Sequence, residues 1–249
     1  MRFPRSSSAM SSFGPGPMTP AVRAIVIANV AVFVLGLVAP AQVVSTFGLL
    51  PRDVIERGRV WQLATFLFVH PPGSFMTLLF NMLSVWMFGV DLERRWGTIG
   101  FLKFYAVAGI GAGACVMALS LLPFDSTRAI FVAGRTVGAA GAVYGLLMAW
   151  ALLFPYRQIL FMLIFPLQAW VAACLMGAIA FFSAFNSGSP VANIALLGGV
   201  AFGWIYLKGP KDLELTFKYH LTRWRMERMR RRFNVHKGGR NDDWQNRLH

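Results

Sequence analysis

Six blocks of apolar residues, each long enough to cross a lipid bilayer as a helix, dominate this chain of 249 residues. A helix of about 20 residues crosses a hydrocarbon core of about 30 Å, and the blocks have roughly 17 to 24 residues each. Only 14% of the residues are charged, about half the share that is usual in a soluble domain. The sequence therefore predicts an all-α polytopic membrane protein with spans at 22–40, 75–91, 99–122, 138–154, 166–185 and 191–207.

The Lys and Arg residues are distributed unevenly between the two sides that six spans would create. The side with both termini and the loops after the second and fourth spans holds 19 of the 24 Lys and Arg residues. Loops rich in these residues stay in the cytoplasm during membrane insertion. We therefore expect cytoplasmic termini. No cleavable signal peptide precedes the first span, so we expect this span to act as an uncleaved insertion signal.

The composition divides the chain into three regions. Residues 1–21 are rich in Ser, Gly and Pro and are expected to form a disordered cytoplasmic tail. Residues 22–207 form the membrane domain, and residues 208–249 form a basic cytoplasmic tail with an amphipathic helix beside the membrane. In this second tail we expect a few aromatic and basic side chains to contact anionic lipid headgroups, namely Trp224, Arg228, Arg230, Arg231 and Arg232. We do not expect nucleic acid as a partner, although basic charge alone does not separate lipid from RNA or a protein.

The segment 47–69, between the first two spans, combines charged and apolar residues. It ends in an apolar run that begins at Trp61. Because Trp is enriched at membrane–water interfaces, one hypothesis places this segment half in the membrane, with Trp61 at headgroup depth. The alternative is a folded outer loop with no special role.

Three of the spans contain two glycines four residues apart. Small residues at this spacing let helices approach closely in lipid, where no hydrophobic effect drives helices together. Since three different spans carry such a pair, we expect a compact bundle with a tightly packed centre. The pairs are Gly109 with Gly113, Gly141 with Gly145, and Gly199 with Gly203.

Several short motifs occur in a characteristic order between residues 60 and 203. They are Trp61-Gln62, Leu78-Leu79-Phe80-Asn81-Met82, Leu92-Glu93-Arg94-Arg95-Trp96-Gly97, Gly138-Ala139-Ala140-Gly141 with Tyr144-Gly145, and Gly199-x-x-x-Gly203. In this order they resemble the rhomboid family of intramembrane serine proteases. The resemblance implies a six-transmembrane-helix rhomboid-like bundle with a water-filled cavity that opens to the outer face. It implies no cofactor.

The resemblance also implies a catalytic arrangement. In active members, a Ser early in the fourth helix attacks the scissile carbonyl, and a His on the sixth helix takes its proton. A His and an Asn on the second helix stabilise the oxyanion. In this chain the Ser position is Ala140, the base position is Leu196 and the second-helix His position is Thr77, so only Asn81 is kept. Three losses together predict a pseudoprotease that binds transmembrane segments of client membrane proteins without cleaving them.

An active intramembrane serine endopeptidase with a rearranged site is the alternative. His70 is the one histidine near the outer face, and the nearest hydroxyls are those of Ser74, Thr77 and Thr136. Nothing in the sequence places any of them in attack geometry with His70. A channel or transporter is disfavoured, because the spans hold almost no ionisable residues that could line a path.

The remaining expectations concern the cysteines and the location. Cys115 and Cys174 both lie in apolar spans, and two such cysteines form neither a disulfide framework nor a metal site. We expect them to be packing residues. Because no organelle targeting signal is evident, the expected location is a prokaryotic inner membrane, with the lipid bilayer and client transmembrane segments as partners.

Overall fold

The computed structural model describes residues 15–122, 132–161, 165–186, 191–209 and 226. The chain divides into two compact units, 1–207 and 208–249, and the fold below is that of the first. The proposed lipid-binding residues of the second tail lie outside the described residues, as does most of the first tail; those residues are Trp224, Arg228, Arg230, Arg231 and Arg232.

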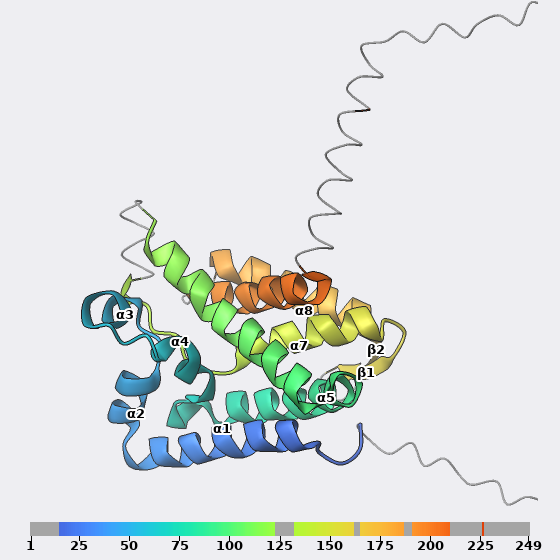
Figure 1. Cartoon of the computed structure of the whole chain (residues 1–249), viewed down its shortest axis with the longest axis horizontal. Coiled ribbons are helices and arrows are strands. Elements are labelled where there is room, and N and C mark those ends of the chain that lie inside the picture. Colours follow the sequence, from blue (N-terminus) through green and yellow to red (C-terminus); the bar gives the residue numbers. More distant parts are fainter. Residues whose placement is uncertain (1–14, 123–131, 162–164, 187–190, 210–225, 227–249) are drawn as a thin grey trace, which may run out of the picture. The chain divides into compact units, whose positions relative to one another are not determined.

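The first unit is a bundle of apolar helices. Within the described residues, three helices are long and apolar enough to cross a membrane: α1 (Pro20–Val38), a long element around α5, and Val191–Gly209. Two further apolar helices in this unit are α7 (Ala140–Leu153) and α8 (Ala169–Asn186). Figure 1 shows α7 inside the bundle, alongside both α5 and α8. The prediction of a mostly helical membrane protein with several spans is confirmed.

The long helix α5 (Phe75–Ser120) is two helical arms joined at Gly97. Gly97 has φ 72° and ψ 167°, a backbone conformation outside the helical region that Gly adopts without a steric penalty. The arms before and after Gly97 cover the predicted second and third spans. A single left-handed glycine thus lets the chain turn back after a very short connection.

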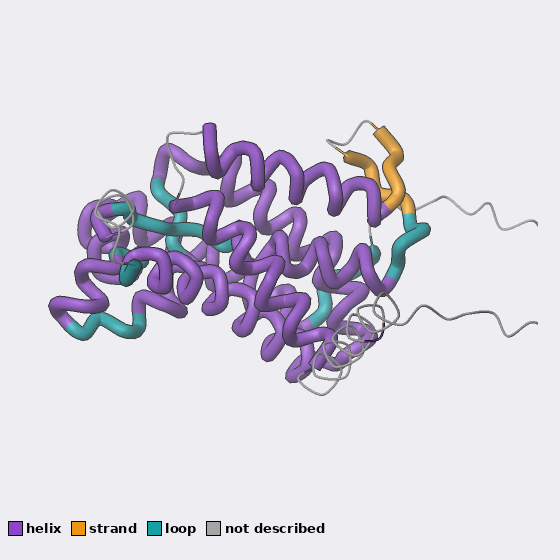
Figure 2. The backbone as a smooth tube through the Cα atoms, turned by 90° about the horizontal axis from the view of Figure 1, so that it is seen from above, coloured by secondary structure: helices purple, strands orange, loops and turns teal. Residues whose placement is uncertain are grey.

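The fifth predicted span begins at the wrong residue. Residues 158–168 form a two-stranded antiparallel hairpin, β1 (Gln158–Phe161) with β2 (Phe165–Gln168), at one end of the bundle (Figure 2). Pro166 pairs with Leu160 in this hairpin, so α8 starts at Ala169 and not at residue 166. An apolar run with a proline near its start does not reveal by hydropathy alone where the helix begins, because the run can equally supply a short strand.

The glycine pairs lie where the predicted tight centre requires them. A Cβ atom built on Gly199 would lie 2.0 Å from the carbonyl oxygen of Gly141, and one built on Gly145 would lie 3.0 Å from the oxygen of Gly199. The backbones of α7 and the helix Val191–Gly209 are therefore in direct contact. A Cβ on Gly141 would also lie 2.6 Å from the methyl of Ala112, on the second arm of α5. The expectation of a tightly packed centre is confirmed.

The chain between α1 and α5 folds into short helices: α2 (Pro40–Phe47), α3 (Pro51–Arg57), α4 (Gln62–Thr65), η1 (Phe66–Phe68) and η2 (Pro72–Ser74). Phe66 and Leu67 are buried and pack over Gly113 and Gly109 respectively. The fully buried amide of Gln62 accepts from the Leu50 N–H at 3.1 Å. This segment is thus a folded loop fixed to the bundle, and its depth in the membrane stays a prediction.

A buried carboxylate fixes the start of α1 to the turn between the arms of α5. Glu93 accepts hydrogen bonds from the N–H groups of Ala21 and Val22, both at 3.0 Å, and from the hydroxyl of Thr98 at 2.8 Å. The first N–H groups of a helix have no partner within the helix and carry a partial positive charge, which a carboxylate neutralises. Glu93 therefore acts as a cap supplied by a residue about 70 positions away in the sequence.

Candidate active site

The first part of the site is the turn that leads into α7. Ala140 is the first residue of this helix, and Gly138, two residues earlier, has φ 105°. The N–H of Gly138 donates to the carbonyl of Phe66 at 2.8 Å. Because Gly adopts positive φ at little cost, the chain can turn sharply here while the loop between α1 and α5 holds the turn in place. The position implied for a nucleophile is thus rigidly supported, but it carries only a methyl group.

The second part lies on the helix Val191–Gly209. The carbonyl oxygen of Ala195 would lie 3.0 Å from a Cβ built on Gly141, so the residues next to Leu196 and Ala140 are in contact. The structure therefore brings together the two helical turns that would hold a nucleophile and a base. Both Ala140 and Leu196 are half-buried. Their hydrocarbon side chains can neither supply nor accept a proton, which activation of a nucleophile requires.

The third part is a pair of buried polar side chains, Asn81 and His70. Asn81 Nδ2, on the first arm of α5, lies 3.1 Å from His70 Nε2. A Cβ built on Gly138 would lie 3.6 Å from the same His70 nitrogen and 4.0 Å from Asn81 Nδ2. His70 therefore lies between the amide of Asn81 and the turn that begins α7.

Sequence reasoning did not anticipate this position for His70. The motif places the second-helix histidine at position 77, one helical turn before Asn81, but Thr77 is exposed. The signal that could have found His70 is its place at the start of the segment 70–77, directly before the two prolines that lead into α5. Of the predicted site residues, Asn81, Ala140 and Leu196 lie on the contacting helices. Trp61 is about half-exposed on the loop between α1 and α5, where its indole donates to the carbonyl of Thr46 at 3.0 Å.

Burial determines the charge of His70. Its side chain is 2% exposed, and this burial lowers the pKa of the imidazole, an effect that the carbonyl of Phe68 opposes only in part. The neutral ring accepts from the Asn81 amide through Nε2 and so carries its proton on Nδ1. Nδ1 has no hydrogen-bond partner within the described residues. The amide donor of Asn81 is thus already engaged by a ring nitrogen.

The candidate hydroxyls do not complete a catalytic pair. Thr136 is buried and its hydroxyl makes no hydrogen bond in the described part of the chain, while its backbone bridges to Leu49. None of the described Ser and Thr hydroxyls is hydrogen-bonded to His70. The described part of the chain contains no group of three or more His, Cys, Asp or Glu side chains that could hold a metal ion.

Comparison with known proteins identifies the family. The rhomboid domain matches residues 57–209, which is more than half of the chain. The chain belongs to the rhomboid family. It is 34% identical to RHOMBOID-like protein 5 of Arabidopsis thaliana over 102 residues, which cover 41% of this chain and 29% of that relative. It is 35% identical to the mitochondrial Rhomboid protein 1 of Saccharomyces cerevisiae over 101 residues, which cover 40% of this chain and 28% of the relative.

A bacterial relative carries a protease name. Rhomboid protease GluP of Bacillus subtilis is 31% identical over 103 residues, which cover 41% of this chain and 18% of the relative. The matches thus span less than a third of the length of these three relatives. Rhomboid membership confirms the predicted family and a multi-pass integral membrane protein. The relatives bear both "protease" and "rhomboid-like" names, so their names do not decide the chemistry of this chain.

We expect the stability of this rhomboid protein to fall as the pH drops below 6.5, which is the ordinary pKa of His. A His70→Gln variant is expected to lose part of this dependence of stability on pH. In the folded protein His70 stays neutral because its pKa is lowered, whereas in the unfolded chain it binds a proton below 6.5. When only the unfolded state takes up the proton, a lower pH favours unfolding. The contribution of His70 to the free energy of unfolding is therefore present above pH 6.5 and is lost as the pH falls.

Thermal unfolding in detergent between pH 7.5 and pH 5 measures this dependence. A His220→Gln variant, in the tail, is the matched control and is expected to keep the dependence of the native chain. An identical pH dependence in the native and His70→Gln proteins would contradict the neutral, buried state of His70.

Proposed function

We propose that this rhomboid protein is a pseudoprotease, which binds transmembrane segments of client membrane proteins and does not cleave them. The observation that supports the proposal most strongly is the pair of contacting turns on α7 and the helix Val191–Gly209. There Ala140 and Leu196 occupy the positions that the family pattern assigns to a nucleophile and its base.

The chemistry of these positions supports the absence of cleavage. A hydroxyl becomes a competent nucleophile only when a base within hydrogen-bond reach removes its proton. Loss of the Ser or the His of a serine protease lowers kcat by a factor on the order of 10⁶. In this chain both positions are hydrocarbon, and the remaining oxyanion donor, Asn81, is engaged by His70. The position that the family pattern assigns to the base thus offers no proton acceptor to a nucleophile or to water.

The retained bundle supports the binding half of the proposal. The first two turns of α5 expose large apolar side chains, and so does α8; they are Phe75, Met76, Leu79 and Phe80 on the former and Leu175, Ile179 and Phe182 on the latter. In lipid, helices associate through close packing of such faces and through polar contacts rather than by the hydrophobic effect. An apolar helix of another protein can pack against these exposed faces.

Photocrosslinking in cell membranes tests client binding. A photoreactive amino acid at position 79 is expected to form adducts with other membrane proteins, and the adducts should contain the client at its full length. Position 38 is the matched control, because Val38 is also exposed and apolar, at 84%, but lies at the end of α1. Equal, background-level adducts at both positions would count against a client-binding role.

An active endopeptidase with a rearranged site is the second candidate. His70 favours it, because it is a buried histidine close to Gly138 and to the start of α7. The lack of a hydroxyl bonded to His70 among the described residues argues against it. Labelling of the native chain by a serine-directed phosphonate would favour this candidate.

The charge distribution supports a proposed orientation. The excess of Lys and Arg on one side favours cytoplasmic termini for a domain at 22–207 that is flanked by tails at 1–21 and 208–249. The basic tail is proposed to bind anionic headgroups, and a prokaryotic inner membrane is the proposed location.

A further inference from the structure

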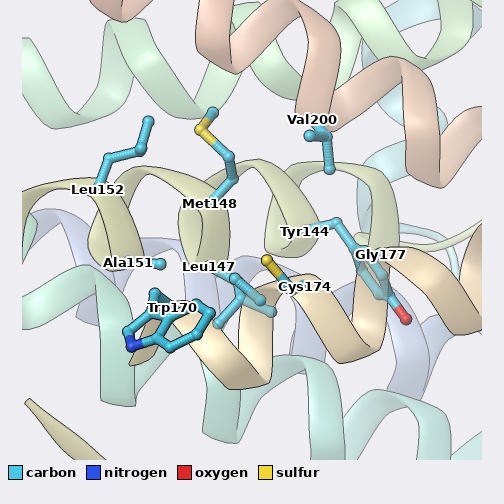
Figure 3. Close-up of a pocket in the computed structure, with 10 residues that line it drawn as sticks. Tyr144, Leu147, Met148, Ala151, Leu152, Trp170, Cys174, Gly177 and Val200 are labelled. Atoms are coloured by element: carbon cyan, nitrogen blue, oxygen red, sulfur yellow. The ribbon is translucent and has the colours of Figure 1, made fainter. Parts of the chain in front are cut away.

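A small apolar groove lies between α7 and α8, and it begins one helical turn beyond Ala140, at Tyr144. Figure 3 shows it along the two helices, with Val200 of the helix Val191–Gly209 on its far side. Its volume is about 240 Å³ and its lining is almost entirely hydrocarbon. Tyr144 and Gly177 lie at one end, and Ala151, Leu152 and Trp170 lie at the other. Nothing in the proposed function uses this groove.

The size of the groove restricts its occupant. Pockets that enclose a drug-sized molecule have about 300–1,000 Å³, and this groove is smaller. A transmembrane helix is about 10 Å across, too wide to enter a hollow of this volume. An empty apolar hollow loses the dispersion contacts that a filling group would make. A single hydrocarbon chain from the bilayer has the chemistry and the width to fill it.

Arg157 lies near the Trp170 end of the groove, although no cation is among the described side chains that line it. The carbonyl of Arg157 accepts from the N–H of Ala169 at 2.8 Å, which places Arg157 beside the first turn of α8. The guanidinium carbons of Arg157 and Arg95 lie 5.0 Å and 6.0 Å from the ring centre of Phe154, one turn beyond Trp150 on α7. Asp91 pairs with Arg157, and Arg95 lies against the same Phe154 ring, so the two guanidinium groups and one carboxylate leave a net positive charge here.

An aromatic residue marks the same end. Trp170 is half-exposed, and its indole N–H donates to the side-chain oxygen of Gln168 at 2.7 Å. Indole rings with one polar edge are typical of the headgroup level of a membrane, as are basic side chains that face anionic lipids. The apolar side chains of the groove can therefore contact a lipid acyl chain, and the arginines near its Trp170 end can attract a lipid phosphate.

We propose that this groove binds one acyl chain of an anionic membrane phospholipid, with the lipid phosphate at Arg157 and Arg95. The site is separate from the headgroup contacts proposed for the C-terminal tail and does not depend on whether the protein cleaves or binds clients. A bound chain would fill the seam between α7 and α8 and hold the two helices together.

Photoreactive lipids test the occupant directly. The full-length protein is reconstituted in phosphatidylcholine vesicles that contain a trace of phosphatidylglycerol with a diazirine in its acyl chain, and the adducts are mapped by mass spectrometry. We expect them to concentrate on 144–152 and 170–177. A Gly177→Leu variant should lose most of them, because a Cβ at Gly177 meets no atom within 4 Å and a larger side chain can fill the groove without disturbing the fold. Ala178→Leu, one residue further on the exposed side of α8, is the matched control and should keep them.

A second comparison tests the charged end. The phosphatidylglycerol probe should label the groove about fivefold more than the same probe with a phosphatidylcholine headgroup, as expected for about 1 kcal/mol of attraction from the one net positive charge that Arg157, Arg95 and Asp91 leave. An Arg157→Gln variant should lose most of this preference and keep labelling of the groove by both probes.

Three outcomes would overturn the proposal. Adducts spread evenly over all lipid-facing helices would show no groove site. Adducts that persist in Gly177→Leu at the native level would show that the groove is not where they form. Adducts of a co-purified protein in place of lipid, on 170–177 of the native chain, would show that a helix and not an acyl chain covers this face.

Discussion

Replacing Gly199 with Ala is expected to destabilise the bundle by about 3 kcal/mol, at the upper end of the usual cost of overpacking. The added methyl would lie 2.0 Å from the carbonyl oxygen of Gly141, a distance that real Cβ atoms do not show. Both sides of this contact are backbone, so no side chain can rotate away to relieve it. The helix Val191–Gly209 would have to move away from α7, which also separates the turns that carry Leu196 and Ala140.

The same substitution at Gly177 is the matched control. Gly177 also lies within an apolar helix, but a Cβ there meets no atom within 4 Å. Gly177→Ala should be neutral or should stabilise the protein by up to about 1 kcal/mol through helix propensity. The two variants are compared by thermal unfolding in detergent. If Gly199→Ala unfolded at the temperature of Gly177→Ala, the close contact between the two helices would be wrong.

The spans were predictable from the sequence because lipid imposes a simple rule. Backbone polar groups within a bilayer must pair internally, so long apolar blocks become helices. The glycine pairs were predictable for a related reason: in lipid, close approach needs small residues. The hairpin at 158–168 escaped prediction because its apolar residues fit a short strand as well as the start of a helix.

Long-range polar contacts were the part of the site that sequence reasoning could not supply. The pairing of His70 with Asn81 depends on the path of the loop through Pro71 and Pro72, which spacing patterns do not encode. Glu93 illustrates the same limit, since its partners at the start of α1 precede it by more than 70 positions. Motif spacing assigned Ala140 and Leu196 from their fixed offsets to glycines that the helix contacts require, and their roles stay a prediction.

The interaction between His70 and Asn81 agrees with the proposed loss of catalysis. A site prepared for acyl transfer keeps its amide donors aimed at the developing oxyanion. Here the donor of Asn81 is directed at a neutral imidazole, and the neighbouring α7 begins with a methyl side chain. Asn81 and His70 thus satisfy one another in part, while Nδ1 of His70 and the hydroxyl of Thr136 are buried without a hydrogen-bond partner among the described residues.

Introducing a hydroxyl at position 140 and an imidazole at position 196 is expected to have the largest effect of all. An Ala140→Ser, Leu196→His double variant places a hydroxyl and an imidazole on turns that already touch. If the scaffold supports them, this variant gains cleavage of a transmembrane reporter, and each single variant stays inactive, because a nucleophile and its base act together and their loss is not additive. The double variant also shows whether the reporter can reach the site.

The most direct measurement is therefore cleavage of a transmembrane reporter in membranes that contain the native chain. Membranes with the double variant and membranes without this protein are the references. Fragments are quantified by mass, so that the site of cleavage is known. We predict that the native chain releases no fragment above the level of the empty membranes. A fragment released by the native chain, and lost in a His70→Ala variant, would contradict the pseudoprotease proposal and assign the chemistry to His70.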